Sequence, residues 1–468
     1  MHSSVRFLSA CVAVLLGGAG CTVGPDYQRP ATAAPSAWKE PAAAPPAAPV
    51  GLASAWWRLY QDPILDAIVA RVVAENQEVR VAAARVAEAR ARLGASRAAA
   101  YPRLDGAAGS TRRYRAADEP ATVGEHRLAF DLGYELDLWG RTRRAVEAGA
   151  AELRASDADR HAVLLAVTAE AARNYHLLRA LDEERAVVEA TAALRRDTLA
   201  LQEARAAAGL INAVDVTRAR TELASVEAEL HALARQRAQL EHALAVLGGQ
   251  APAGFAVEAR AGSVPPPPVP AGLPSALLER RPDLVAAEQG VRAASARIGV
   301  AQAERLPSFR LTGQAGLASA DLRDWLESPS RLASFGPAVT VPLFDAGRTR
   351  AEVEAAQARH EQSVAVYRAR VLQAFREVED ALSDLSALGQ QDAAVARALA
   401  AARDTARLAE ERYGRGLTNY LDVVDAQRAV LQAERQDAQL RGQRLVATTL
   451  LAKALGGGWS AEAPLAMR

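Results

Sequence analysis

The sequence predicts a mainly α-helical protein that also supplies β-hairpins to a membrane β-barrel, arranged as two tandem repeats. Three observations support this fold class: a composition that favours helices, two segments that alternate apolar and polar residues, and motifs that recur at a fixed offset. The 468 residues are 50% hydrophobic and 5% aromatic, and Ala, Arg, Leu, Glu and Val fill long stretches. With 56 basic and 55 acidic residues, no global basic field exists, so nucleic acid is not an expected partner.

Residues 1–20 predict a cleaved signal peptide, because the apolar stretch from Phe7 to Gly20 is too short to span a bilayer and ends in small residues. Of the two cysteines, Cys11 lies in the removed segment and Cys21 would open the mature chain. The arrangement resembles a bacterial lipobox, although Gly18 stands where that pattern has Leu. We expect lipidation at Cys21, with palmitate among the acyl chains; the alternative is ordinary cleavage nearby, which leaves Cys21 a free thiol.

The sequence contains an internal repeat, because the same motifs recur with a constant difference in residue number. The string Gly-Arg-Thr-Arg at 140–143 recurs at 347–350, and Gly-Leu-x-Asn-x-x-Asp-Val at 209–216 recurs at 416–423, both at an offset of 207 residues. A duplicated unit is therefore predicted. The expected organisation is a signal peptide (1–20), a lipid-anchored Pro/Ala-rich extended segment (21–55), repeat 1 (56–249), a Pro-rich linker (250–274) and repeat 2 (275–468).

Each repeat begins with predicted helices, over 62–100 and 277–305, which stop before a Tyr-Pro or Leu-Pro pair. Strands follow. Residues 128–138 alternate apolar side chains with polar, charged or small ones, and 308–317 with a return strand over 339–343 do the same, which gives two hairpins and four strands. The polar face is expected to line water, and its acidic residues are Asp131, Glu135 and Asp137.

Very long helices come next. Residues 348–413 carry a coiled-coil seam at four-three spacing from Val371 to Leu385, and at about 1.5 Å per residue they would extend roughly 100 Å. Residues 141–208 form the matching helix of repeat 1. Both helices are expected to reverse at Gly209 and Gly416 into shorter return helices that Asn-x-x-Asp opens.

Four strands cannot close a barrel, and an eight-stranded barrel is filled by its own side chains. Three chains would supply twelve strands, enough for a pore. The geometry therefore requires self-association, and we expect a trimer in which the apolar strand faces meet lipid.

Several strings in this order resemble the TolC-type outer membrane factors, in the NodT-type (OprM-like) lipoprotein branch of efflux systems. The resemblance covers nearly the whole chain. It implies a homotrimer with a twelve-stranded barrel in the outer membrane and a periplasmic α-barrel, acting as a passive exit duct for small molecules such as drugs. It also implies a periplasmic membrane-fusion adaptor and an inner membrane RND-type transporter as partners. The strings are 21–27 (CTVGPDY), 56–63 (WWRLYQDP), 134–141 (YELDLWGR), 280–283 (RRPD) and 412–428 (RYGRGLTNYLDVVDAQR).

Other classes of function fit the sequence less well. The sequence has no P-loop, no HExxH and no Cys-based metal spacing, and its seven His are scattered, so we expect neither an enzyme nor a cofactor or metal site. A structural periplasmic coiled coil would explain the helices but leaves the strands and the anchor unused. The nearer alternative is the outer membrane duct of a type I polypeptide secretion system.

Two groups of residues are candidates for function. The signature R-x-x-x-G-L marks both helix reversals, where we expect the adaptor to dock; the alternative is that each Gly only caps a helix and each Arg only meets its dipole. Its residues are Arg205, Gly209 and Leu210, and Arg412, Gly416 and Leu417.

Just beyond the second reversal we expect the closed periplasmic gate at Leu421, Asp422, Asp425 and Arg428, since 421, 425 and 428 share one helix face. The alternative there is that the acids only complement the helix dipole.

Overall fold

The chain divides into two units, each assembled from segments of both halves of the sequence. The computed structural model describes residues 22–40, 52, 54–116, 121–262, 264–272 and 274–459; the predicted signal peptide and Cys21 lie outside these residues. The sheet unit comprises Met1–Ala31, Ala84–Asp157 and Ala286–Ala369, and the hairpin unit comprises Thr32–Ala83, Ala158–Val285 and Arg370–Arg468.

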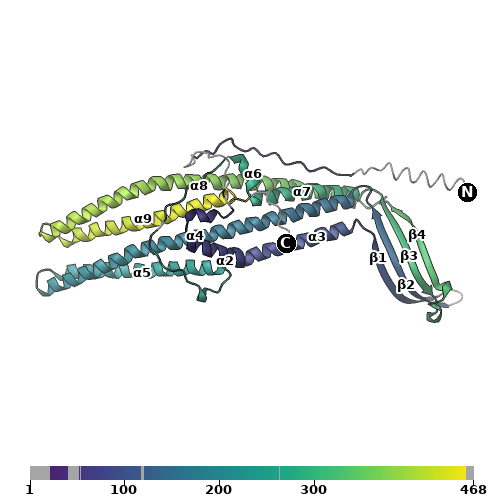
Figure 1. Ribbon diagram of the computed structural model, residues 1–468, viewed down its shortest axis with the longest axis horizontal. Helices are drawn as coiled ribbons and strands as arrows, with labels where there is room; N and C mark the ends of the chain where they lie inside the picture. Colours follow the sequence, from purple (N-terminus) through teal and green to yellow (C-terminus); the bar gives the residue numbers. More distant parts are fainter. Residues whose placement is uncertain are drawn as a thin grey trace. The chain divides into compact units, whose positions relative to one another are not determined.

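The sheet unit holds one antiparallel sheet of four strands in the order β1-β2-β3-β4, drawn as four adjacent arrows in Figure 1. Leu128 of β2 lies opposite Leu317 of β3, which joins strands from the two halves. The chain is thus mostly helical with a four-stranded sheet, as the sequence predicts. The strands are β1 (Arg103–Arg115), β2 (Ala121–Leu136), β3 (Ser308–Ser319) and β4 (Arg331–Thr340).

The two faces of this sheet differ as the alternation predicts. On the apolar face, Leu128 and Phe130 are 38% and 56% exposed, whereas Ala129 on the polar face is fully buried. The polar face is held by side-chain pairs, including Arg127 with Asp131 at 3.3 Å. The apolar face is therefore exposed in the isolated chain, and polar-face side chains such as Arg103 and Arg310 are exposed as well.

The four long helices have matching lengths. Helices α4 (Arg141–Ala207) and α8 (Arg348–Gly414) each have 67 residues, and α5 (Ala213–Leu247) and α9 (Tyr420–Ala454) each have 35. All four pairs of helix ends differ by 207 residues. The seam residues Val371, Val378 and Leu382 are buried, as a coiled-coil stripe requires.

Several element boundaries differ from the sequence prediction. Residues 62–100 form two helices, because Asn76 has an extended backbone and its side-chain oxygen accepts the N–H groups of Glu78 and Val79. The second helical segment breaks at Arg281, whose extended conformation is the one that a following proline favours. Strand β4 ends at Thr340, so Val341 and Leu343 lie outside it. The helices in these segments are α2 (Pro63–Glu75), α3 (Gln77–Ala98), α6 (Leu277–Arg280) and α7 (Pro282–Ala303).

The core of the hairpin unit is aromatic and aliphatic. Trp56 and Tyr60, on the short 3-10 helix η1 (Trp56–Tyr60), pack with Tyr175 and Leu178 of α4 and Leu445 of α9. The hydroxyl of Tyr60 lies 2.9 Å from that of Thr449 on α9. The remaining 3-10 turns are η2 (Pro252–Gly254), η3 (Pro274–Ala276), η4 (Leu322–Asp324) and η5 (Ser328–Ser330).

The extended segments are fastened to the helices by polar contacts. In the sheet unit, Arg144 donates to Asp26 at 2.7 Å and to the carbonyl of Val23, while a Cβ on Gly24 would lie 2.4 Å from Gly299. In the hairpin unit, Arg237 joins Asp182 to the carbonyl of Val257, both at 2.6 Å. The extended segment after Cys21 and the Pro-rich linker are therefore docked segments over the residues described.

Candidate functional site

The tips of the helical hairpins carry the candidate functional residues, and their turns have the expected geometry. Gly209 has φ of +73°, its N–H donates to the carbonyl of Ala206, and the N–H of Leu210 donates to the carbonyl of Arg205, both at 2.9 Å. This pair of bonds is the Schellman motif. The second tip repeats it, with φ of +70° at Gly416. A side chain at either position would be strained, because the left-handed conformation favours glycine.

Both turns expose a leucine. Leu210 is 73% exposed and Leu417 is 63% exposed. Single exposed leucines are common on protein surfaces, but these two occupy equivalent positions at the ends of the two hairpins. Leu210 and Leu417, the two leucines of the docking prediction, are thus exposed to solvent.

The two arginines of the repeated signature have different surroundings. Arg205 donates to the hydroxyl of Tyr413 at 3.0 Å and lies 5.5 Å from the centroid of that ring, a cation–π distance. Arg412 is exposed, and the side chain makes no ion pair or hydrogen bond within the described part of the chain. Arg205 therefore links the first hairpin to the second, a role that the repeat alone did not reveal.

The predicted gate residues lie in the first turns of α9. Asn419 precedes the helix and its side chain accepts the N–H of Asp422, whose carboxylate also accepts the hydroxyl of Thr418. Asp425 and Arg428 form an ion pair at 3.3 Å, and Leu421 is 36% exposed. Asp422 is thus part of the helix cap, whereas Asp425 and Arg428 pair with each other.

The sequence prediction missed Glu222, the acidic partner of Arg428 at this site. Glu222 on α5 is only 7% exposed, and its carboxylate accepts two bonds from Arg428, one of them at 3.1 Å from Nε. Arg195 on α4, 1% exposed, lies 3.7 Å from the same carboxylate. The hydrogen bond to Glu222 is the main cause that raises the pKa of Arg428, so this guanidinium stays charged.

A sequence signal for Glu222 was present. Val216, Ala219 and Val226 form the buried stripe of α5, and Glu222 falls on that stripe at three- and four-residue spacing. A carboxylate on an apolar stripe needs a cationic partner, because burying an unpaired charge is costly.

A second cluster of ion pairs lies seven residues further along α5 and α9. Arg435 of α9 donates to Glu184 of α4 at 2.9 Å and also pairs with Glu229 of α5. Glu222 and Glu229 are seven residues apart, as are Arg428 and Arg435, so the two acids and the two bases form a ladder along α5 and α9. Glu184 is 3% exposed, and the ladder therefore reaches into the interior of the hairpin unit.

The three acidic residues predicted to line water differ in their positions and hydrogen-bond partners. On the polar face of the sheet, Asp131 accepts from Arg127 and Gln314, and Glu135 accepts two bonds from Arg141, at 3.0 and 2.9 Å. Asp137 is not on the strand, because β2 ends at Leu136. Its carboxylate instead accepts the N–H groups of Thr142 and Arg143 at the start of α4, where a negative charge complements the helix dipole.

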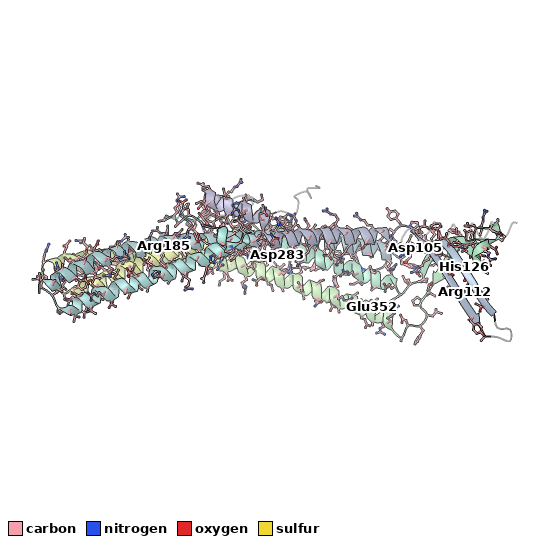
Figure 2. All side chains as sticks on the ribbon, turned by 90° about the horizontal axis from the view of Figure 1, so that it is seen from below. Asp105, Arg112, His126, Arg185, Asp283 and Glu352 are labelled. Carbon is pink, nitrogen blue, oxygen red and sulfur yellow. The ribbon has the colours of Figure 1, made fainter. Side chains whose placement is uncertain are left out.

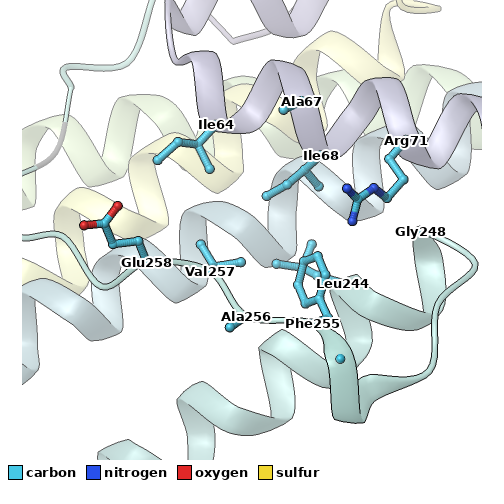
Figure 3. A pocket seen from close by; sticks show the side chains of 11 residues that line it. Ile64, Ala67, Ile68, Arg71, Leu244, Gly248, Phe255, Ala256, Val257 and Glu258 are labelled. Atoms are coloured by element: carbon cyan, nitrogen blue, oxygen red, sulfur yellow. The ribbon is translucent and has the colours of Figure 1, made fainter.

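A hollow of about 340 Å³ lies in the hairpin unit between α2, the end of α5 and the chain that follows it, and Figure 3 shows the side chains that line it. Its wall is mostly aliphatic, and Arg71 and Glu258 are its charged residues. Over the residues described, no group of three or more side chains is arranged to hold a metal ion. None of the described helices has both the length and the apolar composition needed to cross a membrane.

Comparison with known proteins agrees with this architecture. A family model described as "Outer membrane efflux protein" matches residues 68–250 and 273–457. The chain is 33% identical over 475 residues to the solvent efflux pump outer membrane protein SrpC of Pseudomonas putida, covering 97% of this chain and 99% of SrpC. It is 30% identical over 444 residues to the probable outer membrane lipoprotein SilC of Salmonella typhimurium, covering 94% and 96%. The solved structure of the outer-membrane channel OprN matches with a TM-score of 0.87 at 31% identity, covering 94% of this chain and 100% of that one.

A four-stranded sheet with an exposed apolar face, joined to long helical hairpins, defines an outer membrane channel protein. The chain belongs to the outer membrane efflux protein family. It is located in the outer membrane and serves there as the exit duct of an efflux system.

Proposed function

We propose that three copies of the chain form a twelve-stranded barrel that conducts small molecules across the outer membrane. The observation that carries this proposal is the sheet: β1 and β4 are paired on one side only within the described residues, and the apolar face is exposed. Unpaired strand edges do not occur in a hydrocarbon layer, so β4 of one chain pairs with β1 of the next. Three sheets then close a barrel with the face of Asp131 and Glu135 toward water.

The matching lengths of the long helices support a duplicated unit as the origin of the two halves. In the trimer, six helical hairpins would surround the axis as a periplasmic α-barrel. The tips with Leu210 and Leu417 would then dock a periplasmic membrane-fusion adaptor, which connects the duct to an inner membrane RND-type transporter. As a passive duct, the protein would need no catalytic residue or cofactor.

The first turns of α9 form the periplasmic gate in this proposal. The ion pair of Arg428 with Glu222 holds α9 against α5, while Asp425 pairs with Arg428 within α9. A hollow of about 370 Å³ beside the Glu222–Arg428 pair is lined by both of its residues. Opening would require this pair between the helices to separate. Because Glu222 is buried, the closed state is favoured until the adaptor or transporter compensates for that cost.

The anchor at Cys21 also belongs to the proposal. The docking of Val23 and Asp26 on Arg144 fixes the chain two residues after Cys21 beside the start of α4, where β2 has just ended. The resemblance to SilC, named a probable outer membrane lipoprotein, supports acylation. The barrel holds the protein in the membrane as well, so loss of the acyl chains would lower efflux only partly.

The decisive test combines assembly with conduction. The full chain, purified in detergent, should have the mass of a trimer and should form channels in planar bilayers, and deletion of its gene should raise sensitivity to small toxic compounds. A monomer that does not conduct would contradict the proposal. Loss of a secreted polypeptide on deletion, with unchanged drug sensitivity, would instead support the secretion duct; the family relatives reported above favour efflux.

A further inference from the structure

Near its end, the apolar face of the sheet carries two arginines that have no partner among the described residues. Arg331 of β4 lies opposite Leu317, and Arg112 of β1 lies opposite Gly124; residues directly opposite each other share a face, so both arginines share the face of Leu128 and Phe130. Neither guanidinium makes an ion pair or hydrogen bond within the described part of the chain. In contrast, arginines of the polar face such as Arg103, Arg127 and Arg310 are paired with acids.

The register places both arginines toward the end of the sheet farther from Leu136, four residues apart. Arg331 is level with Leu128, eight residues from Leu136, and Arg112 is level with Gly124, twelve residues from Leu136. With about 3.4 Å per residue and a strand tilt of about 40°, these distances along the barrel axis are about 21 and 31 Å. An apolar band is about 25 Å tall. A band of this height measured from Leu136, the end of β2, would have its far edge between the two arginines, away from the strand ends that lead into the helices.

The neighbours on this face suit an interfacial position. Tyr114, 69% exposed, is two residues beyond Arg112 on the same face, and His126 lies diagonally across from Arg112, opposite Ser110. Figure 2 shows Arg112 and His126 in the same part of the sheet, with Asp105 nearer the other end of β1. Aromatic and basic side chains at the rim of an apolar band are typical of contact with lipid headgroups.

We propose that Arg112 and Arg331 bind the phosphate groups of a phosphorylated glycolipid in the outer leaflet. The proposal rests on the proposed function, since it needs the apolar face to meet lipid. Guanidinium groups bind phosphate through two parallel hydrogen bonds, and an unpaired arginine facing lipid is accommodated best by an anionic headgroup. The acyl chains of the same lipid would then cover Leu128 and Phe130 below.

The test is lipid binding by the purified full-length protein in detergent, measured by native mass spectrometry with lipid A carrying both phosphates. Wild type should retain it and should bind dephosphorylated lipid A more weakly. The Arg112→Ala/Arg331→Ala double variant should lose roughly 25-fold in affinity, about fivefold for each arginine. Arg113→Ala is the matched control, because Arg113 is also exposed and unpaired within the described chain but points to the opposite face.

Equal binding by wild type and the double variant would overturn the proposal, as would equal binding of the two lipids or an equal loss in Arg113→Ala. If the alanine variant fails to assemble, two other double variants allow the same comparison of lipid A binding with wild type. Arg112→Glu/Arg331→Glu should lose the binding, whereas Arg112→Lys/Arg331→Lys should keep most of it. Insertion into phosphatidylcholine bilayers without lipid A is measured in parallel. A chain that does not insert contradicts the proposed function, whereas one that inserts but ignores phosphate contradicts this inference alone.

Discussion

Glu222 of α5 and Arg428 of α9 form an ion pair across 206 residues of sequence, and the carboxylate is almost completely buried. Arg195 approaches the same carboxylate from α4. One acid therefore joins three helices at the end of the hairpin unit. Removing Arg428 would leave the buried Glu222 with only Arg195 as a cationic partner within the described residues, which destabilises the closed arrangement.

The first prediction concerns this gate. Arg428→Ala and Asp425→Ala should raise single-channel conductance in planar bilayers and increase entry of large antibiotics, with Arg428→Ala the stronger because it breaks the pairs to both Asp425 and Glu222. Arg407→Ala is a suitable control, since it removes an exposed pair with Asp404 on α8. Conductance equal to wild type in both gate variants, with trimers intact, would return Asp422 and Asp425 to the role of helix-dipole partners.

The second prediction concerns the tips. Leu210→Asp with Leu417→Asp should abolish crosslinking to the adaptor and leave trimers intact, because the new charges would have to be buried at the contact. Leu372→Asp provides the control, as Leu372 is 68% exposed on α8 but far along the helix from Gly416. If the tip variant crosslinks as well as the control, the glycines act only as helix caps.

The third prediction concerns the anchor. A fatty-acid analogue should label wild type and not Cys21→Ser, and the variant should retain part of the efflux activity because the barrel remains in the membrane. Cys11→Ser serves as the control, since this residue would be removed with the predicted signal peptide. Equal labelling of wild type and Cys21→Ser would show that acylation occurs elsewhere.

The fourth prediction follows from His176 on α4. Its ring is 4.4 Å from that of Tyr60, and burial lowers its pKa from 6.5 to about 4. In the unfolded chain this histidine binds a proton near pH 6.5, so stability is greatest above that pH and falls as the pH drops toward 4. The loss between pH 7.5 and pH 5 should be about 2 kcal/mol per chain.

Thermal unfolding in detergent at several pH values measures this effect. His176→Phe should reduce the dependence of the unfolding temperature on pH over this range, whatever its effect on the absolute value. His231→Phe is the control, because His231 is exposed on α5. An unchanged slope in His176→Phe would show that other groups cause the acid sensitivity.

Local patterns in the sequence determined most of the elements. The Gly and Asn residues at 209, 212, 416 and 419 set one end of each of the four long helices, because a left-handed residue stops one helix and an Asn side chain caps the next. The alternation around Leu128 gave the two faces of the sheet. These features depend on residues a few positions apart, so a single sequence contains them.

Only the tertiary structure decided which groups meet across long separations. Arg205 and Arg412 are equivalent in the repeat, yet Arg205 alone reaches Tyr413. Asp137 continues the alternation of the strand, yet it caps α4 because the chain leaves the sheet one residue earlier. The sequence of α5 predicts that Glu222 is a buried charge, but it does not identify Arg428 on α9 as the partner. Helical periodicity fixes which face a side chain occupies, whereas the packing of distant helices fixes what that face contacts.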